Sequence, residues 1–364
     1  MGETETILIK SDDLRTFTIL VFKAIGCSAI DAELAADVLI QADLRGIDSH
    51  GVARLSGYIR LYEKQRINTK PNIRVVREKK SVFTIDGDSG LGLIIAPRTM
   101  DMAIEKTHLY GSGFGSISNS NHFGIGAYHA MKALEHKFIG ISMTNASPLV
   151  APFQGKERML GTNPICCAIP AGKEKPFVLD MATSAAANGK LEIAERKNLE
   201  IPIGWLESKD GSSTSNPKDL KAGGYLLPLG SDKDHGAHKG YGLSSLVDIL
   251  CGVLSGANYG PWVPPFVSFL PVLDNLPGKG IGHFVGAWDI DGFIEIEEFE
   301  SRMDHWINSF KSSKPNNDHD KVMISGEPEQ NTHSERIKTG IPLNLKVKDA
   351  LKELAIQYKL DHPF

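Results

Sequence analysis

The stretch "LRGIDSHG", residues 44–51, places a serine and a histidine side by side directly after a long apolar run. His50 could donate or accept a proton near neutral pH, because an unperturbed imidazole titrates in that range. Arg54 follows His50 by four residues, which is one helical turn, so a guanidinium could bind a carboxylate beside the proton donor. Ser49, His50 and Arg54 are therefore candidate catalytic and substrate-binding residues.

The same three residues also fit a purely structural role. Ser49 could cap the helix that follows it, with His50 in the first turn of that helix. Arg54 could form an ordinary salt bridge on the surface. The local sequence is compatible with both interpretations and leaves the choice between them open.

A second histidine, His122 in "SNSNHFG", follows a predicted strand and precedes a predicted helix. Ligands in α/β proteins bind at such strand-to-helix connections, although Asn and His are also common in turns that bind nothing. The segment "DMATS", residues 180–184, ends another predicted strand. Thr183 or Ser184 is expected to cap the next helix, whose free amides could meet a phosphate, while a cap without any ligand is the commoner case.

Lys239 lies at the start of a strongly apolar helix, in the motif "HKGYG". A lysine at such a position either extends its amine to water or binds an anionic ligand. His235 and His238 have HxxH spacing, but no cysteine or acid of fitting spacing joins them, so no metal site is expected. The sequence also lacks GxGxxG, a P-loop, HExxH and GxSxG, which argues against a standard Rossmann site, kinases, zincins and serine hydrolases.

The composition is that of an ordinary globular protein. The chain has 364 residues, 41% of them hydrophobic and 23% charged, and a net charge of -4, so no basic surface is expected for nucleic acid. No apolar run is long enough for a membrane helix, and the N-terminus lacks the order of a secretory signal. The four cysteines show no disulfide or zinc spacing, which indicates reduced thiols and a cytoplasmic location.

The hydrophobic pattern divides the chain into helical ends and a mixed centre. Residues 11–66 are predicted to form three helices, with Ser11 capping the first and Ser28 starting the second in a capping box. From about residue 73, strands alternate with helices, which predicts an α/β core. The predicted strands are 73–78, 81–86, 113–118, 138–145 and 281–290, and the predicted helices are 96–107, 127–136, 184–198 and 239–256. Residues 296–359 return to a helical pattern.

Eight segments that occur in order over about residues 10–345 together resemble one family. They are "RGIDSHG", "SNHFG", "TNASPLVAPFQG", "LGTNP", "DMATS", "IPIGW", "HKGYGLSSLVDILCGVLSGA" and "RIKTGIPL". They look like motifs of the malate/L-lactate dehydrogenase family of the second type, which includes L-sulfolactate and ureidoglycolate dehydrogenases and 2,3-diketogulonate reductase. Eight motifs in the same order are far more specific than any one of them.

The resemblance implies a fold and an organisation. The fold class is α/β, a non-Rossmann three-layer α/β/α arrangement with a mixed sheet, similar to L-sulfolactate dehydrogenase. Residues 1–70 would form a helical N-terminal segment, residues 71–295 an NAD(P)-binding core, and residues 296–364 a helical C-terminal segment that packs with the N-terminal helices. The family also implies a homodimer with active sites near the interface, and no metal.

The resemblance further implies roles for individual residues. His50 would be the proton donor, Ser49 its orienting partner and Arg54 the ligand of the substrate carboxylate. In the ureidoglycolate branch the proton acceptor matches His122, so the acid/base assignment stays open between the two histidines. Thr162 corresponds to a substrate contact. The cofactor contacts would be His122, Phe123, Gly124, Asp180, Met181, Ala182, His238, Lys239, Gly282 and His283.

The implied activity is reversible hydride transfer between NAD or NADP, with NAD favoured, and a small 2-hydroxy or 2-oxo acid. Malate or L-lactate is the expected substrate, and ureidoglycolate, sulfolactate and diketogulonate are alternatives within the family. A nicotinamide-binding homologue without catalysis is a further alternative. In the cyclic-imine reductase branch an aspartate follows the glycine that matches Gly189, but this chain has Lys190, which argues against that activity.

Overall fold

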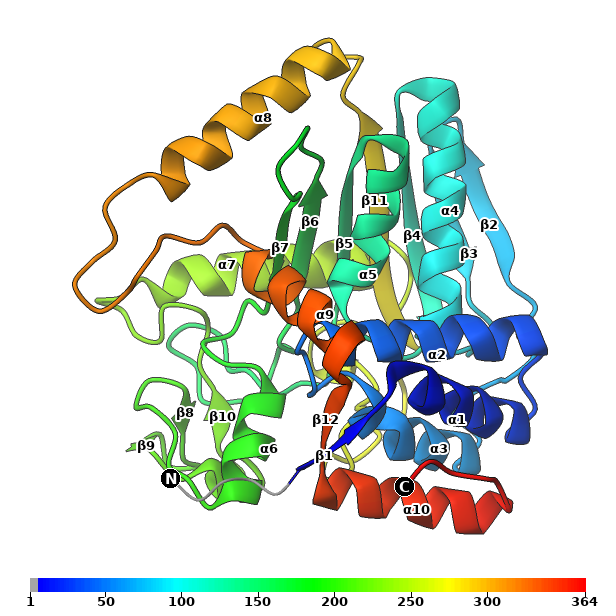
Figure 1. The fold of residues 1–364 in the computed structure, drawn as a ribbon. Coiled ribbons are helices and arrows are strands. Elements are labelled where there is room, and N and C mark those ends of the chain that lie inside the picture. The colour runs from blue at the N-terminus through cyan, green and yellow to red at the C-terminus, as the bar shows by residue number, and fades with distance from the viewer. Residues whose placement is uncertain (1–5) are drawn as a thin grey trace.

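The computed structural model describes residues 6–364 and is built around a seven-stranded mixed sheet (Figure 1). In spatial order the strands are β2 (Arg74–Lys79), β3 (Val82–Asp86), β4 (Ser112–Ser120), β11 (Ile281–Asp289), β5 (Phe138–Thr144), β6 (Ile165–Ile169) and β7 (Phe177–Met181). In this sheet β3 and β4 run parallel and the other neighbouring pairs are antiparallel. β11 comes from late in the chain and inserts between β4 and β5. The predicted mixed sheet is confirmed.

Helices cover both faces of this sheet. α4 (Gly92–Tyr110) and α5 (Gly126–Met131) pack on one face, where Val285 of β11 joins a buried cluster with side chains of α4. The neighbouring Phe284 instead packs with buried side chains of α7 (Ala237–Asp248) and of the π-helical turn that follows it. Successive side chains of a strand point to opposite faces, so α7 lies on the far side of the sheet, as Figure 1 shows. The three-layer α/β/α arrangement is confirmed.

The N-terminal and C-terminal helices form one unit below the sheet in the view of Figure 1. Its elements are β1 (Thr6–Ile9), α1 (Ser11–Ala24), α2 (Ala29–Leu44), α3 (Leu55–Glu63), β12 (Ile341–Asn344) and α10 (Leu345–Tyr358). β1 pairs with β12 in antiparallel register, and Phe17, Leu39 and Leu351 belong to the same buried cluster. The two short strands were not predicted from the sequence.

The predicted caps of the first two helices have different outcomes. The Ser28 hydroxyl accepts the backbone N–H of Asp31 at 3.2 Å and donates to the Asp31 carboxylate at 2.7 Å, so the predicted start of α2 at Ser28 is confirmed. α1 begins at Ser11 itself, and the capping position belongs to Lys10, whose side chain makes no capping hydrogen bond. The predicted Ser11 cap is therefore wrong.

The predicted cap before α6 (Asn188–Lys197) is also wrong. The helix begins after Ala187, so its free amides do not adjoin the "DMATS" segment. The Thr183 hydroxyl donates to the Asn163 carbonyl at 2.9 Å, and the Ser184 hydroxyl donates to the Ala186 carbonyl at 2.7 Å. Both hydroxyls therefore hold the connection after β7 and cap no helix.

A smaller unit packs around α6. Its three-stranded sheet has the order β10 (Tyr225–Leu226), β8 (Leu206–Glu207) and β9 (Ser213–Thr214). Leu191 of α6 and Leu206 of β8 share one buried cluster. Shorter helical turns occur at Val52–Arg54, Lys132–His136, Pro217–Leu220, Ile249–Val253 and Gly260–Trp262. None of the helices in residues 6–364 combines the length and apolar character that a membrane crossing requires.

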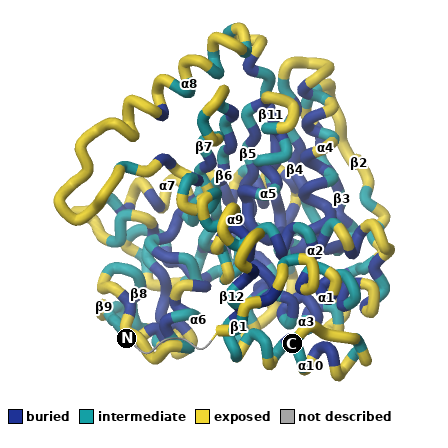
Figure 2. Tube along the Cα trace, viewed as in Figure 1, coloured by how far each residue is buried: buried dark blue, intermediate teal, exposed yellow. Residues whose placement is uncertain are grey.

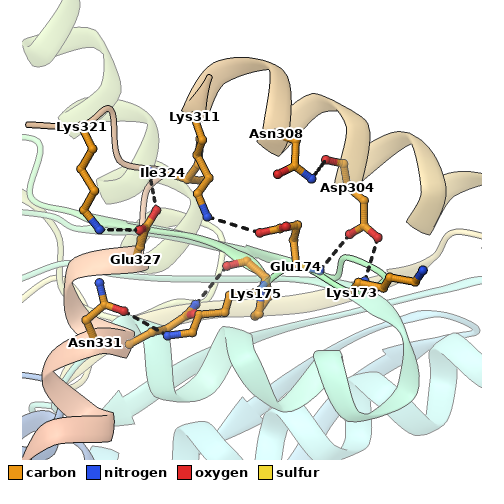
Figure 3. A network of polar contacts seen from close by, with 12 residues as sticks. Lys173, Glu174, Lys175, Asp304, Asn308, Lys311, Lys321, Ile324, Glu327 and Asn331 are labelled. Atoms are coloured by element: carbon orange, nitrogen blue, oxygen red, sulfur yellow. Dashed lines mark hydrogen bonds and ion pairs between the residues drawn. The ribbon is translucent and has the colours of Figure 1, made fainter. Parts of the chain in front are cut away.

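α8 (Ile296–Lys311) runs along the edge of the molecule with most of its surface exposed (Figure 2). Asp304 joins it to the turn between β6 and β7, because its carboxylate accepts the backbone N–H groups of Gly172, Lys173 and Glu174 at 3.0, 2.7 and 3.0 Å (Figure 3). α9 (Glu327–Thr339) follows and leads the chain back to the N-terminal helices. Together with the ion pairs Lys137–Glu300 and Lys311–Glu174, this carboxylate holds an otherwise exposed helix in place.

Candidate active site

The turn between α2 and α3, which carries the first candidate histidine, is held by a buried carboxylate. Asp43 is 2% exposed and accepts the backbone N–H of Val52 at 2.8 Å. Gly51 packs so closely that a Cβ at this position would lie 1.9 Å from Asp43 Oδ1. Arg336 of α9 donates to the Asp43 carbonyl from the other side. The backbone of this turn is therefore fixed both from within and from α9.

Ser49 and His50 form a bonded pair on this turn. Ser49 Oγ lies 2.8 Å from His50 Nδ1. α3 begins only at Leu55 and has no side-chain cap, so the alternative in which Ser49 caps that helix is wrong. The bond to the hydroxyl orients the ring and leaves Nε2 as the nitrogen that can exchange a proton with another molecule.

His122 lies between β4 and α5, where the sequence placed it. Its Nδ1 is 2.6 Å from the hydroxyl of Tyr58 on α3 and accepts the backbone N–H of Gly124 at 3.3 Å. Phe266 packs against the ring with a centroid distance of 4.6 Å. Tyr58 is fully buried, so its hydroxyl fixes the imidazole from the protein side. As in His50, Nε2 remains for a ligand.

The two histidines meet although 72 residues separate them in the sequence. Their rings stack with centroids 5.8 Å apart and an interplanar angle of 24°. Burial, and after it the charge of Arg54, lowers the pKa of His50 to about 3. Burial, and after it the proximity of His50, also lowers the pKa of His122 well below the usual range. Both rings are neutral near pH 7. The Nε2 of His50 can accept a proton, whereas the bond from the Gly124 N–H to Nδ1 places the ring proton of His122 on Nε2.

Arg54 lies beside this pair, as the spacing suggested, but it already has partners. Its Nε donates to the Ser49 carbonyl at 2.6 Å. Its Nη1 and Nη2 bind the two carboxylate oxygens of Glu192 on α6 at 3.2 and 2.9 Å. Asn188 donates to the same carboxylate at 2.8 Å. Arg54 therefore lies where a substrate ligand was expected, but its two terminal nitrogens already bind a carboxylate of the same chain.

A pocket of about 550 Å³ opens next to Arg54. Phe266, which touches His122, lines it together with residues of α3 and α6. Several of the lining side chains are basic, namely Arg54, Arg60, Arg196, Lys218, Lys221 and Lys346. Glu192 and Glu195 line it as well, so cations outnumber acids. The pocket suits a small anion that carries more than one negative charge.

A second pocket, of about 300 Å³, lies where β7 ends beside α5. Asp180 lines it and accepts the backbone N–H of Ala127 at 2.8 Å. Protein atoms crowd the carboxyl group and raise its pKa to about 6, although the residue as a whole is exposed along the pocket. Arg45 also lines the pocket, and its buried Nε has no hydrogen-bond partner. An unsatisfied cationic donor beside a carboxyl suits a ligand with anionic and hydroxyl groups.

Several predicted residues gather at the end of β7. Met181 is the last residue of the strand, and Ala182 follows it. The Thr162 carbonyl accepts the backbone N–H of Thr183 at 2.9 Å, which brings the "LGTNP" segment beside them. His122 and Ala127 belong to one continuous segment, which connects the histidine pair with the Asp180 pocket. The sequence motifs thus converge on one side of the molecule.

His238 and Lys239 lie in the first turn of α7, and both are exposed. His238 has Phe153 as an aromatic neighbour, with centroids 6.0 Å apart. His235 instead pairs with the nearby Asp232 at 2.8 Å. Across the part of the chain that the structure describes, no three His, Cys, Asp or Glu side chains converge as they would around a metal ion.

Gly282 and His283 lie within β11, inside the sheet. His283 is fully buried, and its two ring nitrogens are bonded to Thr144 at 2.7 Å and Ser120 at 2.8 Å. The N–H of Gly282 donates to the Asn145 side chain at 3.0 Å. These polar groups are satisfied within the protein, so we do not include the two residues among the proposed cofactor contacts.

Sequence reasoning did not identify two partners of the site, Tyr58 and Glu192. Tyr58 follows Arg54 by four residues on the same helix, so helical spacing could have pointed to it. Glu192 comes from α6, 138 residues after Arg54, and no local pattern connects the two. Only the packing of α6 on the turn that carries Ser49 and His50 brings this acid to the guanidinium.

Comparisons with known proteins point to one family. The family model for malate/L-lactate dehydrogenase matches residues 9–352. The malate dehydrogenase of Pyrococcus abyssi is 44% identical over 96% of this chain and 94% of its own length. The malate/(S)-sulfolactate dehydrogenase of Methanothermus fervidus is 36% identical over 98% and 99%. The crystal structure of malate dehydrogenase from Entamoeba histolytica superimposes with a TM-score of 0.92 at 33% identity, covering 99% of this chain and 100% of the other.

Proposed function

The chain belongs to the malate/L-lactate dehydrogenase family and is a 2-hydroxy acid dehydrogenase, and we propose that it interconverts malate and oxaloacetate with NAD. The observation that carries the proposal is that Arg54, which lines the basic pocket, lies beside two stacked, neutral imidazoles. Malate has two carboxylates, and the surplus of cations in this pocket favours such a dianion over lactate, which has one.

Arg54 is the proposed ligand of the carboxylate next to the reacting carbon. A guanidinium binds a carboxylate through two parallel N–H bonds, which fixes the direction as well as the position of the substrate. This places C2 of the acid near the histidines, and positioning of this kind supplies a large share of the rate. The second carboxylate of malate would face the lysines and arginines of the same pocket.

His50 is the proposed proton carrier, with Ser49 orienting it, and His122 is the alternative. In oxidation the 2-hydroxyl gives its proton to the free Nε2 of the imidazole, while C2 gives up a hydride. A neutral ring is the form that accepts this proton, in accord with the lowered pKa of His50. In reduction the ring returns the proton to the carbonyl oxygen. The substrate carboxylate favours the charged ring, since it offsets the effect of Arg54 on the pKa of His50.

We assign the nicotinamide cofactor to the Asp180 pocket, which residues of the proposed cofactor-binding region 71–295 form together with Arg45, Ile47 and residues between 323 and 329. When bound, it accepts the hydride from C2 in oxidation and returns it in reduction. The unpartnered Nε of Arg45 offers a donor to a phosphate oxygen, and the Asp180 carboxyl offers an acceptor to ribose hydroxyls. Met181, Ala182 and the segment from His122 to Gly124 would border the cofactor, and the exposed His238 and Lys239 are further proposed contacts. We favour NAD because an acid beside the pocket disfavours an extra phosphate.

We also propose that the enzyme is a homodimer and that the outer face of α7 and of the π-helical turn after it is its contact surface. The exposed apolar side chains on this face are Tyr241, Leu243, Leu246, Ile249, Val253 and Leu254. Residues 240–273 contain a single charged residue, the buried Asp248, so the face offers nothing to a charged partner. An uncharged helix face can bury itself against its own copy about a twofold axis.

The four cysteines are free, which supports a reducing, cytoplasmic location.

Light scattering tests the dimer directly. The unchanged protein is expected to have twice the mass of one chain, and Leu246→Asp is expected to have the mass of one chain. Leu109→Asp, which changes a leucine of α4 that is 72% exposed, is the matched control and should leave the mass unchanged. A single-chain mass for the unchanged protein would overturn the proposal.

The proposed activity is tested by mixing the purified protein with NADH or NADPH and following the loss of absorbance. The compounds offered are oxaloacetate, pyruvate, sulfopyruvate, 2,3-diketogulonate and a cyclic imino acid, and ureidoglycolate is tested in the oxidation direction. We expect NADH to be oxidised fastest with oxaloacetate. Faster oxidation of NADH with sulfopyruvate or pyruvate would mean that sulfolactate or lactate, and not malate, is the substrate. Binding of NADH without any turnover would favour the non-catalytic alternative.

A further inference from the structure

The guanidinium of Arg54 has no pair of N–H bonds left for a substrate. A guanidinium presents two edges on which two N–H bonds run parallel, one between Nη1 and Nη2 and one between Nε and a terminal nitrogen. Glu192 uses the first edge with both of its oxygens, and the Ser49 carbonyl takes the Nε–H of the second. The N–H bonds that remain on Nη1 and Nη2 diverge. A carboxylate from solution can therefore not bind in the bidentate manner while Glu192 stays in place.

This ion pair is built into the fold. The side chains of Arg54 and Glu192 are only 15% and 27% exposed. The helix that carries Glu192 packs tightly on the catalytic turn, because a Cβ at Gly189 would lie 2.5 Å from Ser49 Cβ and 3.4 Å from Arg54 Nη2. Asn188, one turn before Glu192 on the same helix, donates to the carboxylate that faces Arg54.

We propose that Glu192 occupies the substrate-carboxylate edge of Arg54 in the ligand-free enzyme and yields this edge to the incoming acid. The inference rests on the proposed role of Arg54 as the carboxylate ligand. Glu192 acts as a specificity-determining residue, since a ligand has to carry a carboxylate of its own to take its place. A 2-oxo ester or amide of the same shape has no negative charge and cannot displace Glu192 from Arg54.

The surroundings of Glu192 allow the exchange. The basic pocket beside Arg54 is lined by Arg60, Arg196 and Lys346, so a displaced carboxylate finds another cation without leaving the pocket. In the ligand-free state the pair neutralises a half-buried guanidinium next to two imidazoles. Exchange of one carboxylate for another keeps this charge balance, because each state has one anion on Arg54.

The test compares Glu192→Gln with Glu200→Gln. Glutamine keeps the size of the side chain and removes the charge, so the substrate carboxylate displaces it from Arg54 more easily. We expect the KM for oxaloacetate and the dissociation constant of oxalate, a carboxylate that cannot be reduced, to fall about three- to tenfold in Glu192→Gln. Glu200 is exposed, follows the same helix and does not line the pocket, so its variant controls for the loss of one negative charge. Both constants should stay within about twofold of the unchanged enzyme in this control.

Any of the following outcomes would overturn the proposal. A higher KM and weaker oxalate binding in Glu192→Gln would mean that Glu192 only orients Arg54. Equal falls in both variants would mean that a general change of charge is responsible. Glu192→Asp, which keeps the charge on a shorter stem, should give constants between those of the unchanged enzyme and Glu192→Gln, and melting curves check that each variant is folded. Arg54→Lys, measured in parallel, separates the two levels: an unchanged KM there refutes Arg54 as the carboxylate ligand, whereas a raised KM with no fall in Glu192→Gln refutes the exchange alone.

Discussion

His50 and His122 stack with their ring centroids 5.8 Å apart, and each ring is bonded at Nδ1 to a hydroxyl of the protein. Ser49 holds the first ring and the buried Tyr58 holds the second. A positive charge on one imidazole disfavours a charge on the other at this separation. At most one of the two rings is therefore positively charged at a time, and the two histidines titrate as a coupled unit.

Removal of each imidazole tells which one carries the proton. His50→Ala is expected to lower kcat for oxaloacetate reduction by about a hundredfold or more, the usual contribution of a positioned acid/base group. His122→Ala should have a smaller effect on kcat, because its ring would then only support the pocket. A near-normal rate in His50→Ala with a large loss in His122→Ala would reverse the assignment.

Substitution of the guanidinium tests substrate binding. Arg54→Lys keeps the positive charge but loses the two parallel N–H bonds, so the KM for oxaloacetate should rise about tenfold. Steady-state kinetics with saturating NADH measures this value. Arg74→Lys is the matched control, since Arg74 is an exposed arginine of β2 that pairs with Asp86, far from the pocket residues in the fold. An unchanged KM in Arg54→Lys would remove Arg54 from the carboxylate site.

Tyr58 supports the site from below, and its hydroxyl can be removed without changing the ring. Tyr58→Phe leaves His122 Nδ1 without its 2.6 Å partner, so we expect the free energy of unfolding to fall by about 1 kcal/mol. Loss of this bond also frees the ring to turn, which should shift the pH profile of kcat/KM. Urea unfolding and a pH series measure the two effects. Tyr62→Phe, on the same helix, is the control, and equal changes in both variants would contradict a specific role for Tyr58.

Stability should fall in mild acid because of buried, neutral histidines. His129 is fully buried, its Nε2–H donates to the Phe123 carbonyl at 2.9 Å, and its Nδ1 has no partner. Burial lowers the pKa of His129 from 6.5 to about 4. Between pH 6.5 and pH 4 the imidazole is therefore protonated in the unfolded chain but not in the folded chain. The contribution of His129 to the free energy of unfolding is thus fully present above pH 6.5 and declines as the pH falls toward 4. The gap corresponds to about 3 kcal/mol.

This pH effect is measured by urea unfolding of the unchanged protein and of His129→Gln between pH 7 and pH 4. The variant should show a shallower decline of stability, because glutamine has no proton to gain in this range. His305→Gln, which changes an exposed histidine of α8, should keep the full slope. Identical slopes in all three proteins would show that His129 does not contribute to the decline.

The sequence predicted those features that depend on near neighbours. The cap that Ser28 and Asp31 form at the start of α2 spans three residues, so its geometry is contained in the local pattern. The Ser49–His50 pair and the nearby Arg54 were likewise visible as candidates because they share one turn. The paired strands β1 and β12 were not visible, because each has four residues and its partner lies more than three hundred residues away. Short strands carry little pattern of their own.

The errors have the same physical origin. Ser11 and Thr183 both have the right residue type for a cap, but the chain places Lys10 and Ala187 at the capping positions. The Thr183 hydroxyl is drawn instead to the Asn163 carbonyl, which tertiary packing brings beside it. Glu192 was missed for the same reason, since its contact with Arg54 depends on the docking of a distant helix. In each case tertiary contacts, and not the local residue preference, determine where the side chain binds.

The pairing of β1 with β12 has a consequence for how the enzyme is made. A ribosome releases residues 6–9 long before residues 341–344 exist, so the three N-terminal helices emerge while the strand and helix that cover them are still missing. Arg336, which secures the turn beneath His50, also arrives late. A nascent chain therefore exposes apolar surface until translation is nearly complete, and a prematurely stopped chain lacks the support of its catalytic turn.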